Sequence, residues 1–183
     1  ELAERDGAPL RFEAGQFLTL HLEVDGERLR RAYSLSSSPR SGPTATITVK
    51  RVAGGRVSNW LNHHARAGME LLALGPSGSF VVPERATELS LIAGGSGITP
   101  IVSIAETLRR ARPDVPSKLI YGNRDLDSVI FRERLEALEL SVEHVLEAPP
   151  DGWAGRTGRL DAEHLGAWLG DDHERHHYFV CGP

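Results

Sequence analysis

A glycine-rich turn, set between an apolar run and a helical pattern, is the first feature of the chain that could do chemistry. The apolar run at residues 89–93 predicts a buried strand. Three glycines follow it: Gly94, Gly95 and Gly97. Thr99 is predicted to cap a helix that starts at Pro100, so this helix end could hold an anion such as a dinucleotide phosphate. A tight turn without a ligand gives the same pattern.

A second turn of the same kind lies in the first half of the chain. Its motif residues are Gly55, Arg56, Val57 and Ser58. Ser58 is predicted to cap a short helix, which would place a second helix N-terminus behind glycine. Taken alone, these residues also fit an ordinary capped helix that binds nothing.

The elements that must position the second turn are predicted to be antiparallel strands. Residues 16–24 alternate apolar and polar side chains, as a half-buried strand does. Asp25-Gly26 is a hairpin signal, and the return strand, at about residues 28–35, contains Arg31, Ala32, Tyr33 and Ser34. A third strand is expected at residues 44–52, which are rich in threonine and β-branched side chains.

The second half of the chain changes to alternating strands and helices. Strands are predicted at residues 89–93, 118–121, 141–146 and 178–181, and helices at 100–111, 128–138 and 161–169. This order predicts a parallel doubly wound sheet, in which ligands bind at the carboxyl ends of the strands. Residues 94–97, 122–124 and 181–183 all follow strands and should line that edge. We place the domain boundary after residue 82.

Four motifs in this order resemble those of the ferredoxin–NADP reductase superfamily, over nearly the whole chain. Arg31-Ala32-Tyr33-Ser34 resembles its flavin motif, and the turn at Gly55–Ser58 resembles its flavin pyrophosphate turn. Residues 94–100 resemble its nicotinamide-nucleotide turn, and residues 178–183 resemble its signature near the C-terminus. The resemblance implies an antiparallel β-barrel binding FAD over residues 1–82. It also implies a parallel α/β domain binding NAD(P)H over residues 83–183.

The resemblance also implies roles for single side chains. Arg31 would pair with a flavin phosphate, and Tyr33 would lay its flat ring on the flavin. Ser34 would lie near the reactive flavin nitrogen, and Cys181 near the nicotinamide. The alternatives without a cofactor are that Arg31 is a surface arginine, Tyr33 a core tyrosine and Cys181 a small buried residue. Together with the sheet-edge argument, cofactor binding is assigned to Arg31, Ala32, Tyr33, Ser34, Gly55, Arg56, Val57, Ser58, Gly94, Gly95, Gly97, Thr99, Asn123, Arg124, Cys181, Gly182 and Pro183.

The choice between NADPH and NADH depends on residues after the second strand of the α/β half. Arg124 could pair with the 2′-phosphate of NADPH. Asp125 and Asp127 stand close by and could instead accept from the 2′-hydroxyl of NADH, or cap the next helix. The balance leans slightly to NADPH.

Composition excludes several classes of function. The net charge of −4 predicts no non-specific binding of nucleic acid. No apolar run reaches membrane-spanning length and no signal peptide is visible, so no membrane partner is expected. The single cysteine, Cys181, excludes an internal disulfide or cysteine-ligated cluster here and favours the cytoplasm. The polar segment Asp171, Asp172, His173, His176 and His177 is interpreted as a solvated turn, and no metal site is expected.

The resemblance implies a flavin-dependent NAD(P)H reductase that passes single electrons to a ferredoxin-type iron–sulfur domain or oxygenase component. Any [2Fe–2S] cluster would belong to a part of the parent protein outside these residues. We also expect the parent protein to continue beyond Pro183. A free-standing flavin or haem-protein reductase, use of FMN in place of FAD, and a non-catalytic nucleotide-binding regulator remain alternatives.

Overall fold

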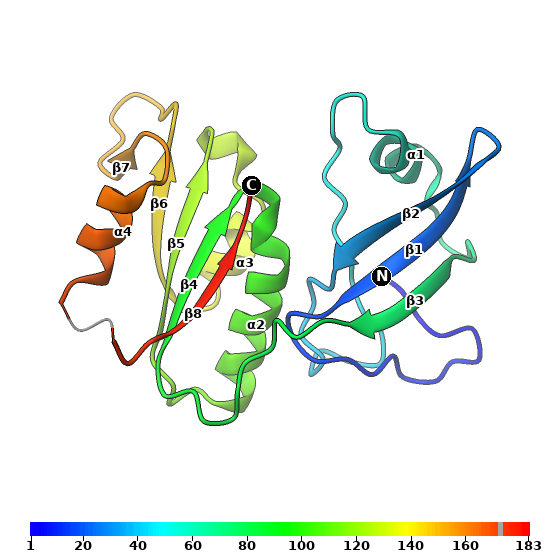
Figure 1. Ribbon diagram of the computed structural model, residues 1–183, viewed down its shortest axis with the longest axis horizontal. Coiled ribbons are helices and arrows are strands. Elements are labelled where there is room, and N and C mark those ends of the chain that lie inside the picture. Colours follow the sequence, from blue (N-terminus) through cyan, green and yellow to red (C-terminus); the bar gives the residue numbers. More distant parts are fainter. Residues whose placement is uncertain (172–173) are drawn as a thin grey trace.

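The chain folds into two lobes, and each lobe is built around one β-sheet (Figure 1). The computed structural model describes residues 1–171 and 174–183. A three-stranded sheet has the order β2-β1-β3, and a five-stranded sheet has the order β7-β6-β5-β4-β8. The first sheet is antiparallel and the second is parallel. The expected fold class, an antiparallel β domain followed by an α/β domain, is confirmed.

The antiparallel sheet is built around β1 (Phe17–Val24), which lies between β2 (Glu27–Ser34) and β3 (Leu72–Ser77). The turn from β1 to β2 is Asp25-Gly26, with φ of 53° and 76°, as a two-residue hairpin requires. Alternate residues of β1 are buried, so one face of the sheet forms a core.

Helix α1 (Arg56–His64) covers that face through Val57 and Leu61, which lie in one apolar cluster with Leu20 and Leu22. The predicted cap at Ser58 is wrong, because the helix begins two residues earlier with Gly55 at the cap position. The Ser58 hydroxyl instead donates to the Gly55 carbonyl and accepts from the Val52 amide.

The parallel sheet has helices on both faces. Its strands are β4 (Leu89–Gly94), β5 (Ser117–Asn123), β6 (Ser141–Leu146), β7 (Arg156–Thr157) and β8 (His177–Cys181). Its helices are α2 (Ile98–Ala111), α3 (Arg132–Glu136) and α4 (Ala162–Leu169), with short 3-10 turns at Gly95–Gly97 and Leu126–Ser128. Core residues of α2 and α3 share one cluster, whereas Leu165 and Trp168 of α4 pack on the opposite face.

Three local predictions differ from the structure. Residues 44–52 form no regular strand, because the side chains of Ser36 and Ser37 take up both backbone groups of Thr46. The helix expected at 128–138 is reduced to Arg132–Glu136, because Phe131 adopts a left-handed conformation with φ of 64°. Thr99 is not a cap: α2 begins at Ile98, and the Thr99 hydroxyl donates to the Ser96 carbonyl.

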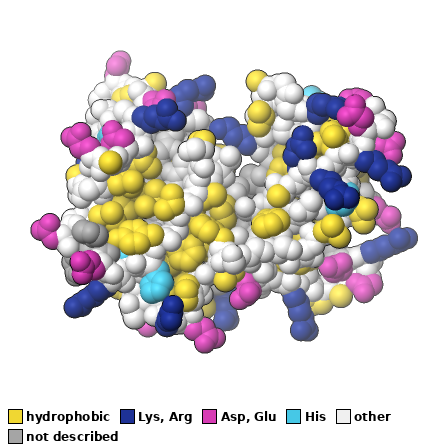
Figure 2. Space-filling model, in the orientation of Figure 1, with side chains coloured by type: hydrophobic (Ala, Val, Ile, Leu, Met, Phe, Trp, Pro, Cys, Tyr) yellow, Lys and Arg dark blue, Asp and Glu magenta, His cyan; other side chains and the backbone are white. Residues whose placement is uncertain are grey.

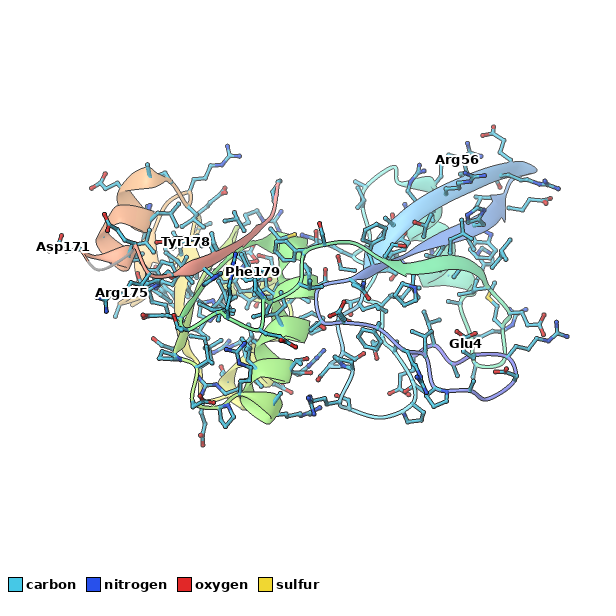
Figure 3. The ribbon with its side chains drawn as sticks, turned by 60° about the horizontal axis from the view of Figure 1, so that its bottom comes forward. Glu4, Arg56, Asp171, Arg175, Tyr178 and Phe179 are labelled. Carbon is cyan, nitrogen blue, oxygen red and sulfur yellow. The ribbon has the colours of Figure 1, made fainter. Side chains whose placement is uncertain are left out.

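The edge strand β8 shows how alternation divides the two faces of the sheet. Phe179 is buried and meets Phe80 edge to face, with ring centroids 5.0 Å apart. Its neighbour Tyr178 points to the other face and is 41% exposed (Figure 3). None of the helices in the described part of the chain is long and apolar enough to cross a membrane.

Candidate functional site

A cavity of about 590 Å³ lies at the carboxyl ends of β4, β5 and β8. The surface is hollowed between the two lobes on the face shown in Figure 2. Seven predicted site residues line the cavity: Gly94, Gly95, Asn123, Arg124, Cys181, Gly182 and Pro183. They belong to three separate loops, so the parallel sheet brings together what the sequence keeps far apart.

Two of these loops touch backbone to backbone. A β carbon at Gly182 would lie 3.0 Å from the amide nitrogen of Gly94. One at Gly97 would lie 2.0 Å from the carbonyl oxygen of Cys181. Gly97 is therefore buried against the last loop and does not line the cavity, and Thr99 is buried within α2. These two predicted residues therefore support the glycine turn without facing the cavity.

Tyr121 of β5 holds the glycine turn through a hydrogen bond to its backbone. Its side chain is fully buried, and its hydroxyl donates to the Gly95 carbonyl at 2.8 Å. The same oxygen accepts from the Ile130 amide. Burial raises the pKa of Tyr121 to about 12, so the donor stays protonated.

Asn123, at the end of β5, has a poorly satisfied polar atom. Its residue surface is 8% exposed, and its buried amide nitrogen makes no hydrogen bond of good geometry within the described residues, although it lies close enough to the Tyr121 hydroxyl to offset part of the rise that burial causes in the pKa of that group. An unpaired buried donor is costly. Because Asn123 also lines the cavity, an oxygen atom of a bound nucleotide would satisfy this donor.

Charged residues border the same cavity. Arg124 donates to Asp125 at 2.8 Å, which lowers the pKa of that carboxyl group. Lys50 and Arg159 are cations that the sequence motifs did not single out. Lys50 comes from the first lobe, and its ammonium nitrogen would lie 4.0 Å from a β carbon at Gly95. No local pattern marks Lys50, because only the meeting of the lobes brings it here.

The predicted flavin residues lie in the antiparallel lobe and do not line this cavity. In the β1–β2 register, Arg31 lies opposite Leu20, and Tyr33 lies opposite Leu18. Both therefore belong to the face that α1 covers, and Tyr33 packs in the same cluster as Val57. Two motifs distant in sequence thus share one face. Ser34 ends β2 with its side chain half-buried.

The start of α1 is free to receive an anion. No side chain caps its first turn, so its leading amides point outward without a side-chain partner. Arg56 is already engaged: it pairs with Glu27 at 2.7 Å and donates to the Val24 carbonyl. Figure 3 shows Arg56 beside the hairpin, far from β8. These contacts tie the start of α1 to the hairpin, and a cofactor-binding role for Arg56 stays a prediction.

Family models match both lobes. Residues 3–82 match the oxidoreductase FAD-binding domain, and residues 91–183 match the oxidoreductase NAD-binding domain. The chain belongs to the ferredoxin–NADP reductase family. The two domain models identify FAD and a nicotinamide nucleotide as the cofactors, in the order that the motifs predict.

Curated members of the ferredoxin–NADP reductase family include reductases of oxygenase systems. The chain is 36% identical over 180 residues to the glycine betaine monooxygenase reductase subunit of Pseudomonas aeruginosa, covering 94% of this chain and 49% of that protein. It is 42% identical over 191 residues to the ferredoxin reductase component of 3-ketosteroid-9-alpha-monooxygenase from Mycolicibacterium smegmatis, covering 100% and 51%. The chain spans about half the length of the curated relatives it matches.

Solved structures of the family share the two-lobe arrangement. The Amycolatopsis cytochrome P450 reductase GcoB superposes with a TM-score of 0.78 at 30% identity, covering 93% of this chain and 53% of that one. The FAD/NAD-binding domain of the Vibrio cholerae nitric oxide dioxygenase superposes with a TM-score of 0.82 at 23% identity, covering 99% and 90%. The second likeness concerns the fold alone.

The histidine-rich segment near the C-terminus has structural contacts where it is described. His176 lies 2.6 Å from the Ser90 hydroxyl through Nδ1 and 3.1 Å from the Glu88 carboxylate through Nε2. Asp172 and His173 lie outside the described residues. Over residues 1–171 and 174–183, no three metal-binding side chains gather.

Proposed function

We propose that this chain is the flavin and nicotinamide-nucleotide part of an NAD(P)H-dependent reductase that supplies an oxygenase with electrons through a ferredoxin-type iron–sulfur acceptor. One observation carries the proposal: the loops after β4, β5 and β8 open into a single cavity, to which the flavin lobe contributes Lys50. A cavity shared by both lobes is where two cofactors can meet. When bound, NAD(P)H supplies a hydride and FAD passes electrons on singly.

The residues of the chain bind and orient the nucleotide in this proposal. Asn123 donates an amide hydrogen to the nucleotide, and Lys50 and Arg159 attract its phosphates. Gly94 and Gly95 let the nucleotide reach the backbone.

Cys181 is proposed to lie beside the nicotinamide. It is half-buried in the cavity wall, and burial raises the pKa of its thiol. The thiol is therefore neutral near pH 7 and adds no negative charge beside the reacting carbon. We propose that Cys181 shapes the hydride-transfer geometry by contact and that Ser34 donates a hydrogen bond to the flavin from the end of β2.

The choice of acceptor rests on the relatives, two of which are named as reductase components of monooxygenases. One of them is named a ferredoxin reductase component. A [2Fe–2S] domain would lie in the part of the parent protein that corresponds to the unmatched half of these relatives. We place the reaction in the cytoplasm, where a free thiol such as Cys181 stays reduced.

Anaerobic mixing of the FAD-loaded chain with NADPH or NADH tests the proposal. We expect the flavin colour to bleach and a plant-type [2Fe–2S] ferredoxin to be reduced afterwards. Asn123→Leu should raise the KM for the nucleotide about tenfold, as expected for one lost hydrogen bond to a charged group. The control Glu163→Gln, on the exposed side of α4, should not change it. A flavin that binds but stays oxidised with both nucleotides would leave only a binding protein.

A further inference from the structure

Arg134 joins three elements at the boundary of the two lobes. Its guanidinium donates to the Glu106 carboxylate through Nε at 3.0 Å and through Nη2 at 2.7 Å. Nη2 also donates to the carbonyl of Ser36 at 2.8 Å. Arg134 belongs to α3, Glu106 to α2, and Ser36 to the loop that follows β2. One side chain of the second lobe therefore binds a residue of its own lobe and a residue of the first lobe.

The two hydrogen-bond acceptors of Arg134 belong to buried residues. Ser36 is fully buried, and the Glu106 residue is 9% exposed. A carboxylate so enclosed is stable only when it is paired. The planar guanidinium donates to Glu106 through two nitrogens and to the Ser36 carbonyl through one of them, a fixed fork that the compact ammonium group of a lysine does not reproduce.

Phe131 holds the guanidinium in place. The Arg134 guanidinium carbon lies 4.5 Å from the centre of the Phe131 ring. Phe131 itself has φ of 64°, a conformation that is rare for a bulky residue and costs free energy. The residue with this unfavourable backbone is thus the one whose ring packs against the Arg134 guanidinium.

Further polar contacts along α2 join the same two lobes, and together with the Arg134 contacts we call them the seam. Ser103 donates to the Ser37 carbonyl at 2.7 Å, and Thr107 donates to the Ser38 hydroxyl at 2.8 Å. Ser38 and Ser103 are both fully buried. Each residue of the loop from Ser36 to Ser38 is thus tied to the α/β lobe.

The seam connects the two predicted cofactor motifs. Ser36 follows Ser34, the last residue of the flavin motif, by two positions. Glu106 lies in the helix whose N-terminal end follows the glycine turn of the nucleotide cavity. We propose that Arg134 is a positioning residue that sets the distance between the flavin and nicotinamide sites. This inference rests on the proposed function, because it concerns the transfer step between those sites.

The physical reason is the steep dependence of transfer on geometry. Misplacing reacting groups by about 1 Å can cost roughly a hundredfold in rate. The first lobe has an apolar cluster of its own, whereas the core of the second lobe also takes in Ala14 and Phe80 of the first. A seam with one bond missing can therefore shift by such an amount while both cores stay packed. Arg134 should therefore affect the rate of transfer more than the affinity for either cofactor.

Stopped-flow reduction of the FAD-loaded full chain tests this inference with Arg134→Lys. Lysine keeps a positive charge beside Glu106 but loses the rigid two-nitrogen fork that fixes Arg134 between Glu106 and Ser36. We expect the rate constant at saturating NAD(P)H to fall at least about tenfold. The affinities for FAD and for the nucleotide should change less than about twofold, and the Tm should stay within a few degrees. Arg132→Lys is the matched control: it lies on the same helix and pairs with Glu136 at the exposed surface.

The outcomes separate the two proposals. A wild-type chain that fails to reduce its flavin removes the proposed function and this inference with it. A wild-type chain that reduces its flavin, with an unchanged rate constant in Arg134→Lys, overturns the positioning role alone. A fall in Tm with an unchanged saturating rate also overturns it, because Arg134 would then serve only stability. If Arg134→Lys folds poorly, Ser103→Ala removes a second bond of the seam while Arg134 and Glu106 stay paired. The same fall in saturating rate is expected, and an unchanged rate overturns the inference.

Discussion

The backbone of Gly97 lies directly against the carbonyl group of Cys181, so that a β carbon at Gly97 would stand 2.0 Å from the carbonyl oxygen. This contact joins the start of α2 to the end of β8. It explains why a glycine stands here even though Gly97 does not line the cavity. The turn and the last loop are therefore packed together with no room for a side chain between them.

Gly97→Ala is expected to destabilise the protein by about 1–3 kcal/mol, because the added methyl group must displace the Cys181–Gly182 backbone. Thermal or urea denaturation measures this loss. Gly166→Ala is the matched control, since a β carbon at Gly166 in α4 meets nothing within 4 Å. The control should gain up to about 1 kcal/mol. Equal stability of Gly97→Ala and the wild type would contradict the close contact.

Arg31→Ala is expected to weaken FAD binding about tenfold to a hundredfold, through the loss of about 1.5–3 kcal/mol of charged hydrogen bonding. Arg31 is exposed on the same face of β2 as Tyr33, and its guanidinium donates to the Arg30 carbonyl. Fluorescence titration of the apoprotein with FAD measures the affinity. Arg30→Ala, on the opposite face of the strand, should bind FAD normally. Equal effects of the two variants would argue against a specific role of Arg31.

Arg124→Ala is expected to lower kcat/KM for NADPH at least about tenfold and to leave the value for NADH nearly unchanged. The structure orients Arg124 at the cavity rim through its bond to Asp125, which leaves the terminal guanidinium nitrogens available for a 2′-phosphate. Steady-state kinetics with both nucleotides measures the difference. Similar losses with both would assign Arg124 to a part that the nucleotides share.

Tyr121→Phe is expected to change the alkaline stability of the protein. Burial raises the pKa of Tyr121 from 10.0 to about 12, so the folded state holds this proton more tightly than the unfolded state. The resulting stability is fully present below pH 10 and is lost as the pH rises toward 12. The loss over this window should be roughly 2–3 kcal/mol.

The phenylalanine variant should lack this extra loss, although at pH 7 it should be about 1 kcal/mol less stable without the bond to Gly95. Urea denaturation of both proteins at several pH values between 7 and 12 measures the difference. Parallel curves over the whole range would show that Tyr121 does not titrate differently in the folded state.

The fold class could be predicted from the sequence because it depends on local patterns. The alternation in β1 and the Asp25-Gly26 turn specify a hairpin through side-chain period and permitted φ. The alternating strands and helices after residue 88 specify a parallel sheet. That topology alone places the loops at Gly94, Asn123 and Cys181 on one edge, as the cavity shows.

Helix ends and the irregular third segment were less predictable. Ser58 and Thr99 have the side chains of caps, yet glycines at 55 and 97 occupy those positions. Propensity ranks residue types, whereas the start of a helix is fixed by what its first turn packs against. The shortening of α3 depends on the left-handed Phe131, whose cost is supported only by its tertiary contacts.

The two kinds of sheet, the glycine turns and the order of the motifs could be predicted, because each is encoded by neighbours a few positions apart. Which residues meet between the lobes depends on the tertiary structure. Lys50 reaches the nucleotide cavity, and Arg134 binds Glu106 and Ser36 across a separation of up to 98 positions. The reason is that such contacts depend on how two complete lobes are oriented, and no periodicity within either lobe carries that information.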